Sequence, residues 1–239
     1  MNVRAFAAAQ LVFFCGHAVI AKAQPSVDTP TEQSPDNLTA YWDQPVPAPH
    51  RAFELTLTTS LVAGMGQVPG GGGDSVSETL DQGTSVAVAV AYRASPTWAL
   101  ELGTAYELYD KGPTMAAATS ARGAVARVST TYHFDSSSRT DPWLKGGVGY
   151  RWLQQSDSLG TSHEFHGFEL TGLAVGLDLR VDPRFAFGPA LGADLNLLLW
   201  DRSHAATDPR LSIFLYLGVQ ARVDFSGRLL HAKELATVE

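Results

Sequence analysis

The residues from Val86 to Tyr109 alternate in character with a period of two, and this alternation constrains the fold more than any other feature of the chain. Bulky apolar side chains occupy one parity, whereas Ala, Gly and a few Glu residues occupy the other. A short Ser95-Pro96-Thr97 corner interrupts the pattern midway. Because a period of two is that of a β-strand, we predict a hairpin with one large apolar face and one small face.

The same two-faced pattern recurs between residues 51 and 226, where one further segment precedes the hairpin and five follow it. Each segment is long enough for a tilted strand that crosses a membrane, which needs ~9–11 residues. The connections alternate between longer and tighter ones along the chain. These features together predict an all-β fold, an eight-stranded antiparallel up-and-down transmembrane β-barrel.

The bulky face is predicted to contact lipid and the small face to line a narrow lumen. Bulky residues occur on all eight strands, and a small lumen could not hold their combined volume. The other face is rich in Ala and Gly, unlike a water-facing exterior. Aromatic residues near the strand ends predict girdles at two membrane interfaces. The predicted girdle residues are Phe53, Tyr92, Trp98, Tyr106, Tyr132, Phe134, Tyr150, Trp152, Phe185, Phe187 and Phe225.

The small face carries eleven charged residues, six acidic and five basic. We interpret them as a neutral ion-pair network that fills the lumen, and a polar conduit or gate is the alternative. The predicted lumen charges are Glu54, Glu101, Glu107, Arg127, Lys145, Arg151, Asp178, Arg180, Asp194, Arg222 and Asp224.

Four of these charges, Glu107, Arg127, Arg151 and Asp194, fall at a similar height in an upper tier, and the other seven form a lower tier. Arg127 and Glu107 lie on strands that are neighbours in sequence, so we predict that they pair. Arg151 is the alternative partner of Glu107, because the stagger of the strands could bring it close.

The N-terminal segment has the features of a secretory signal peptide. Arg4 precedes an apolar stretch that ends in Ala21-Lys22-Ala23, an A-x-A cleavage site, so we predict that residues 1–23 are removed. Residues 24–50 contain six prolines and are predicted to form a periplasmic linker. The barrel then spans 51–226, and 227–239 form a short C-terminal tail. The single cysteine, Cys15, lies in the signal peptide, so disulfides cannot stabilise the mature chain.

The charge balance and the short motifs argue against several classes of function. A formal net charge of −7 argues against a nucleic-acid partner. His163 and His166 have a spacing that suits a helix face, with no obvious third ligand nearby, so we assign no metal site. Pro69–Asp74 lacks the Lys of a phosphate-binding loop, and no G-x-S-x-G motif is present. We assign no catalytic or cofactor-binding residue.

Residues 51–226 resemble the small eight-stranded outer-membrane barrels of Gram-negative bacteria, the OmpA/OmpX-like group. The last strand, LSIFLYLGVQARVDF, looks like the C-terminal assembly signal of that group, with Gly218 and a terminal Phe225. Unlike the group pattern, a tail follows Phe225. The resemblance implies export to the outer membrane, contact with membrane lipids and lipopolysaccharide, and insertion by the outer-membrane assembly machinery, with no cofactor.

The resemblance implies a non-enzymatic barrel that presents surface loops, for envelope integrity or for adhesion and binding. A small pore is the first alternative. A lipid A-modifying enzyme is the second, because barrels of that kind have a similar size. The deacylase type uses a His-x-Ser pair, and the segment His163–Phe168 has no such serine. The sequence does not identify an extracellular ligand.

Overall fold

The computed structural model describes residues 45–67, 76, 80–111, 118–157, 162–201, 204–225 and 227. The predicted signal peptide, most of the predicted linker, the motif Pro69–Asp74 and the tail beyond residue 227 lie outside these ranges, so the conclusions drawn from them stay predictions. Within the described residues, no helix is long and apolar enough to cross a membrane.

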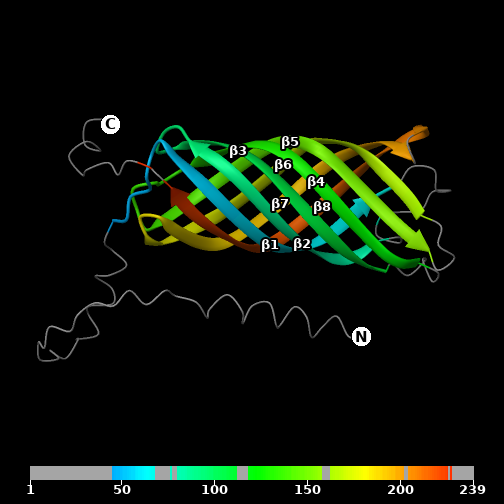
Figure 1. Cartoon of the computed structure of the whole chain (residues 1–239), viewed down its shortest axis with the longest axis horizontal. Coiled ribbons are helices and arrows are strands. Elements are labelled where there is room, and N and C mark those ends of the chain that lie inside the picture. The colour runs from blue at the N-terminus through cyan, green and yellow to red at the C-terminus, as the bar shows by residue number, and fades with distance from the viewer. Residues whose placement is uncertain are drawn as a thin grey trace, which may run out of the picture. The chain divides into compact units, whose positions relative to one another are not determined.

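Eight antiparallel strands form one closed barrel, which confirms the predicted fold class (Figure 1). Each strand pairs with the next, and β1 pairs with β8, so no strand edge is left open. In hydrocarbon, closure of this kind satisfies the backbone donors and acceptors that an open edge would expose. The strands are β1 (Ala52–Gly66), β2 (Leu80–Arg93), β3 (Trp98–Lys111), β4 (Ala118–His133), β5 (Thr140–Asp157), β6 (Ser162–Asp182), β7 (Phe185–Asp201) and β8 (His204–Phe225).

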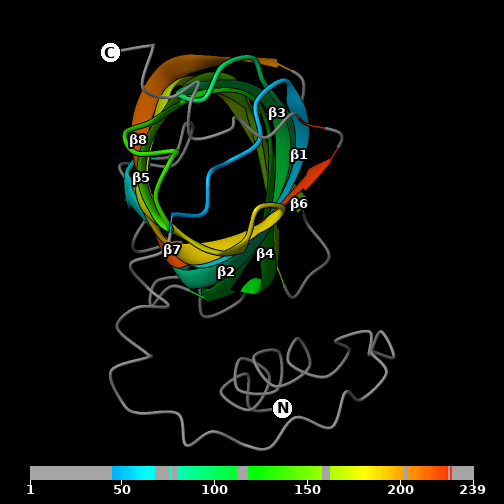
Figure 2. The ribbon, with the colours of Figure 1, turned by 90° about the vertical axis from the view of Figure 1, so that its left-hand side faces the viewer.

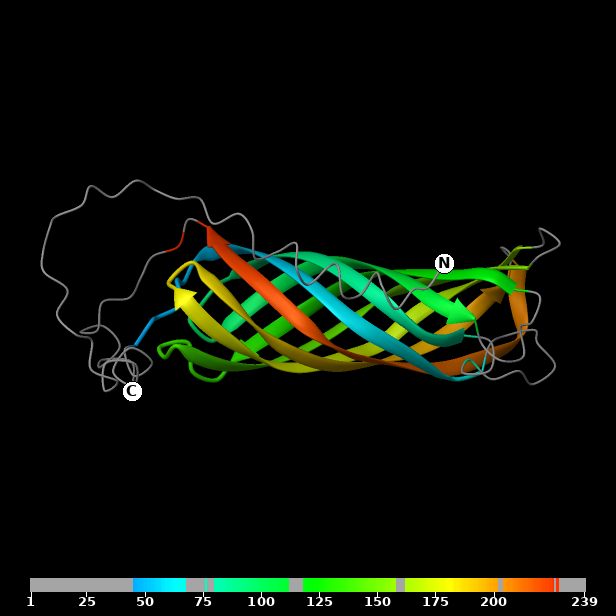
Figure 3. The same cartoon turned by 90° about the horizontal axis from the view of Figure 1, so that it is seen from below.

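The two ends of the barrel differ in their connections. Residues 94–97, 134–139 and 183–184 join β2 to β3, β4 to β5 and β6 to β7, at the end where β1 begins and β8 finishes (Figure 3). We call this the short-turn end, and the opposite end the long-loop end. In outer-membrane barrels, short turns face the periplasm and long loops face the exterior.

Large apolar side chains cover the outside of the barrel. Leu102, Val148 and Leu217 are 65%, 58% and 59% exposed, while their chain neighbours on the other parity face inward. The eleven residues of the predicted aromatic girdle are all exposed or half-buried on this outer face. At the short-turn end their rings pack together across strands, as Trp98 and Tyr132 do with a centroid distance of 5.0 Å.

A β-bulge in β6 changes which parity faces inward. The pairing register of β6 with β7 shifts between Glu169 and Thr171. Glu169 is buried and its neighbour Leu170 is 43% exposed, whereas after the bulge Gly172 is buried and Leu173 is 55% exposed. The extra residue therefore moves the inward set from odd to even numbers. This shift brings Glu169 into the lumen, a position that a single uniform alternation does not predict.

Candidate functional site

The interior of the barrel is the candidate site, and its long-loop end is filled with apolar side chains. Tyr109 and Phe214 are buried there with their ring centroids 6.1 Å apart. This group of residues, the apolar plug, consists of Val62, Val76, Leu80, Tyr109, Ala121, Leu153, Phe165, Leu198 and Phe214. Small residues were expected along the lumen, so this plug was not predicted, although Val62 continues the inward parity of Glu54, Thr56 and Ser60.

Directly against the apolar plug lies a charged cluster, the upper cluster, made of Glu107, Arg127, Arg151, Glu169 and Asp194, of which Arg127 is half-buried and the others are buried. Arg151 is fully buried, and its guanidinium lies 4.0 Å from the Phe214 ring centroid. Arg151 donates to Glu107 Oε2 at 2.5 Å and to Asp194 Oδ2 at 2.9 Å. Arg127 donates to both carboxylate oxygens of Glu169, at 2.6 and 2.7 Å, and also contacts Asp194.

The pairing of Arg127 with Glu107 that the sequence predicted is wrong, and the alternative, Arg151 with Glu107, is correct. The reason is that glycines lie in the intervening strands. Gly149 lies between Arg127 and Glu169 in the strand register, so the Arg127 side chain passes over β5 to reach β6. A Cβ atom on Gly123 would lie 2.8 Å from Glu107 Oε2, so Glu107 uses the space above β4 to reach β5.

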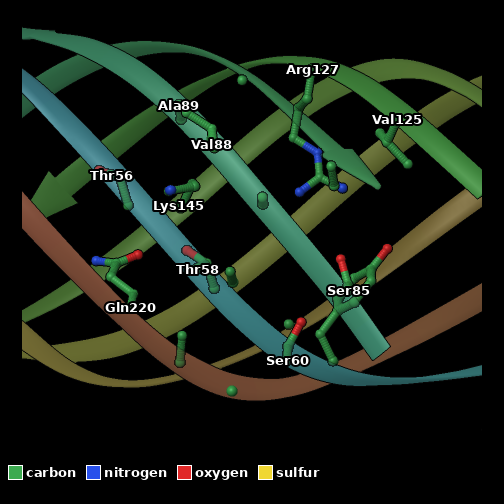
Figure 4. A pocket seen from close by; sticks show the side chains of 18 of the residues that line it. Thr56, Thr58, Ser60, Ser85, Val88, Ala89, Val125, Arg127, Lys145 and Gln220 are labelled. Atoms are coloured by element: carbon green, nitrogen blue, oxygen red, sulfur yellow. The ribbon is translucent and has the colours of Figure 1, made fainter. Parts of the chain in front are cut away.

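Below the upper cluster, the lumen widens into a cavity of about 120 Å³, the chamber (Figure 4). Its polar lining includes Thr56, Thr58, Ser60, Ser85 and Gln220, and Figure 4 shows these side chains directed into it. Ala and Gly residues of β2, β3, β6, β7 and β8 form much of the remaining wall, which leaves this level of the barrel unfilled.

One ion pair lies against the chamber wall. Lys145 contacts both carboxylate oxygens of Glu101 at 2.8 Å, and Ser129 donates to the same carboxylate at 3.2 Å. Lys145 and Glu101 were both predicted lumen charges, and the structure brings them together.

A second charged cluster, the lower cluster, fills the lumen toward the short-turn end. It contains the predicted lumen charges Glu54, Asp178, Arg180, Arg222 and Asp224, together with three residues that were not predicted, Arg93, His133 and Asp141. Three of its ion pairs join Arg93 to Glu54, Arg222 to Asp178 at 2.6 Å, and Arg180 to Asp224 at 2.9 Å. The missed residues continue the inward parity of their strands, so extending each strand by one or two steps would have found them.

Three groups of the lower cluster, His133, Asp141 and Asp178, place potential metal-ligating atoms within 4.8 Å of one another. Both ring nitrogens of His133 are already engaged, one by Asp141 at 2.8 Å and the other by Arg93 at 3.0 Å. Asp178 accepts from Arg222 at 2.6 Å. Two adjacent guanidiniums and satisfied ligand atoms disfavour a metal ion here.

The two histidines considered for metal binding in the sequence analysis lie in β6, in a strand rather than a helix. The His166 ring stacks on Trp200 with a centroid distance of 5.3 Å and contacts the Tyr150 hydroxyl. The His163 side chain lies outside the described part of the chain.

Residues 45–50, the last six of the predicted linker, cover the short-turn mouth, and we call them the strap. Figure 2 shows this blue segment running across the barrel opening. Val46 and Ala48 are 8% and 3% exposed, and the Ala48 amide donates to the Ser136 carbonyl at 2.7 Å. The strap thus lies across the end of the lumen below the lower cluster.

No family model matches the chain, and no curated protein matches it in sequence. Among solved structures, it is similar to Neisserial surface protein A, with a TM-score of 0.54 and 15% identity, over 72% of this chain and 97% of that one. Further matches are OprG from Pseudomonas aeruginosa (TM-score 0.49, 12% identity, 74% and 97% covered) and AlkL (0.46, 14%, 86% and 100%). The closed eight-stranded architecture and the match to Neisserial surface protein A show that the chain has the fold of the small outer-membrane β-barrels, the group that its sequence resembles.

Proposed function

We propose that the chain is a non-enzymatic integral outer-membrane protein whose barrel is closed to ions and whose long-loop end acts at the cell surface, in envelope integrity or in adhesion. Membrane lipids and lipopolysaccharide would surround its apolar outer face, and the outer-membrane assembly machinery would insert it.

The observation that carries this proposal is the sequence of layers inside the barrel. From the long-loop end, the lumen contains the apolar plug, the upper cluster, the chamber, the lower cluster and the strap. Each of the four layers other than the chamber contains buried side chains, such as Phe214, Arg151 and Arg222 at 0–1% exposure. An ion would have to pass all four layers in series, and each would require a change in packing or the loss of an ion pair.

A planar-bilayer recording of the refolded protein tests the closed lumen. We expect no stable single-channel conductance, with an open porin recorded in the same bilayer as a positive control. A reproducible conductance step from the wild-type protein would contradict the proposal and favour a small pore.

Surface presentation is tested with epitope tags on intact cells. A tag inserted between Lys111 and Ala118, in the β3–β4 connection, should bind antibody without permeabilisation. The same tag between Asp182 and Phe185, in a short turn, should bind only after permeabilisation. The reverse result would contradict the orientation, and a changed lipid A mass spectrum on overexpression would favour an enzyme instead.

A further inference from the structure

Arg122 of β4 is a cation on the outer face of the barrel. It is exposed, its chain neighbours Ala121 and Gly123 are buried, and its strand partner Leu108 is 53% exposed on the same outer face. The cations that pair with carboxylates inside the lumen are Arg93, Arg127, Lys145, Arg151, Arg180 and Arg222. Arg122 differs from them in its direction and in having no carboxylate partner within the described part of the chain.

The position of Arg122 along β4 is where the apolar band of the outer face ends. Tyr132, whose ring belongs to the girdle at the short-turn end, lies ten residues further along the strand. At ~3.4 Å per residue and a tilt of ~40°, these residues span ~25 Å, which is the height of the apolar band in outer-membrane barrels. Trp152 and Tyr150 of the girdle at the long-loop end lie one and two strand pairs below Arg122. The guanidinium is therefore at the level of lipid headgroups.

Two side chains of β5 orient the guanidinium of Arg122. Its Nε donates to Gln154 Oε1 at 2.7 Å, and its central carbon lies 5.9 Å from the Trp152 ring centroid. The terminal nitrogens Nη1 and Nη2, which carry four of the five N–H donors, have no partner among the described residues. An oriented guanidinium with free terminal donors suits an anion that accepts two parallel hydrogen bonds, such as a phosphate.

The carboxylates of the same outer face do not supply this anion. Glu164 of β6 lies on the far side of Gln154, whose amide nitrogen donates to it at 3.4 Å. Asp110 of β3 is exposed two residues beyond Leu108 and forms no ion pair with Arg122 in the described part of the chain. An anion of the membrane surface is thus the partner that the charge of Arg122 calls for.

Aromatic rings beside Arg122 form a contact surface on the outer face of β5, β6 and β7. The His166 and Trp200 rings stack at 5.3 Å between centroids, and Phe168 contacts Trp200 at 5.8 Å and Tyr150 at 5.9 Å. Tyr150 and Phe168 are 38% and 47% exposed. Rings with an apolar body and polar atoms at the edge, such as those of Tyr, His and Trp, suit the boundary between headgroups and acyl chains.

We propose that this surface binds the head of one lipopolysaccharide molecule, with a lipid A phosphate on Arg122 and the first part of the acyl chains against Tyr150 and Phe168. The phosphate matches the free guanidinium donors in charge and in geometry. The inference rests on the proposed function, because lipid A surrounds the long-loop end only if that end faces the cell exterior.

Native mass spectrometry of the refolded protein in a non-ionic detergent, with bisphosphorylated lipid A added, tests the binding. The wild-type protein should retain one lipid A, and it should retain dephosphorylated lipid A or phosphatidylglycerol less. Arg122→Gln should reduce the retention of lipid A about fivefold, as expected for the loss of one basic group near an anionic lipid. Arg184→Gln is the matched control, because Arg184 is an exposed arginine in the turn at the opposite end of the barrel.

Equal retention of lipid A by the wild type and by Arg122→Gln would overturn the proposal. Equal retention of phosphatidylglycerol and lipid A by the wild type would overturn the assignment to lipid A. Arg122→Lys keeps the charge without the planar donor pair, so its retention should fall between those of the wild type and Arg122→Gln, and it decides the question if Arg122→Gln does not fold. Micelles impose no orientation, so these results do not depend on the closed lumen or on the epitope tags. A reversed tag result would contradict the proposed function without changing the binding to Arg122, whereas unchanged retention in the variants would overturn this inference alone.

Discussion

Arg151 of β5 and Glu107 of β3 form an ion pair at 2.5 Å in which neither side chain is exposed. Replacing Arg151 with Ala leaves Glu107 and Asp194 without this partner inside the barrel. We expect Arg151→Ala to lower the free energy of unfolding by ~3–5 kcal/mol. Reversible unfolding in urea, with the protein refolded into lipid bilayers, measures the loss. A cost near zero would mean that water reaches these groups.

A double-mutant cycle tests whether Arg127 pairs with Glu169, as the structure shows, or with Glu107. Arg127 is bidentate with Glu169, so Arg127→Ala and Glu169→Ala should show a coupling energy of ~0.5–3 kcal/mol. The cycle of Arg127→Ala with Glu107→Ala should show a smaller coupling, because no direct contact joins these two residues in the structure. Stronger coupling to Glu107 than to Glu169 would restore the pairing that sequence adjacency suggested.

The difference between the two faces can be measured at neighbouring positions in β6. Val175 is 49% exposed on the outer face, and Ala174 lines the chamber. Val175→Arg should cost ~2–4 kcal/mol near the bilayer midplane, because the charge enters hydrocarbon. Ala174→Arg should act through crowding of the lumen, so its cost should be the same in bilayers and in detergent micelles. If Val175→Arg refolds into bilayers without loss, the outer face does not contact lipid.

Gly172 should tolerate no side chain. A Cβ atom there would lie 2.9 Å from Asp194 Oδ1 and closer still to Glu169 Oε1. Gly172→Ala should therefore displace the upper cluster and cost ~1–3 kcal/mol. Gly146→Ala is the control, because its nearest neighbour would be Leu173 Cδ2 at 3.7 Å, an ordinary contact. Equal stabilities of the two alanine variants in urea unfolding would show that the upper cluster adapts without cost.

The fold was predictable because alternate residues of each strand in a membrane barrel face lipid and the lumen, so their side chains alternate in character. Val175 and Ala174 illustrate this, because the larger apolar side chain of Val175 lies on the outer face and the small one of Ala174 lines the chamber. The position of Glu169 was not predictable from uniform alternation, because the bulge next to it breaks the period. The sequence does contain a sign of the bulge. The large apolar residues Phe168 and Leu170 have even numbers, whereas the next one, Leu173, has an odd number.

The sequence predicts which charged side chains face the lumen better than it predicts which ion pairs they form. Pairing across the lumen depends on strand tilt and on the absence of side chains in between, as at Gly149 and Gly123. Strand order alone therefore suggested Arg127 with Glu107, while the three-dimensional register selects Glu169. The apolar plug was missed for a different reason. Leu153 continues the lumen parity of Arg151 beyond the residues that were assigned to it, and Phe214 lies within the last predicted strand but was not assigned to the lumen.

The closed chamber can be tested with cysteine labelling, because the only native cysteine, Cys15, lies in the predicted signal peptide. Ala89 lines the chamber and is 8% exposed, whereas Ala94 lies in the exposed β2–β3 turn. If the barrel is closed as proposed, a charged maleimide should modify Ala94→Cys rapidly and Ala89→Cys only after unfolding, because the apolar plug, both charged clusters and the strap would then separate the chamber from bulk water. Mass spectrometry of the folded protein at timed intervals measures both rates. Labelling of Ala89→Cys as fast as that of Ala94→Cys would show an open path to the chamber, and the closed-barrel proposal would then fail even if no ion current were recorded.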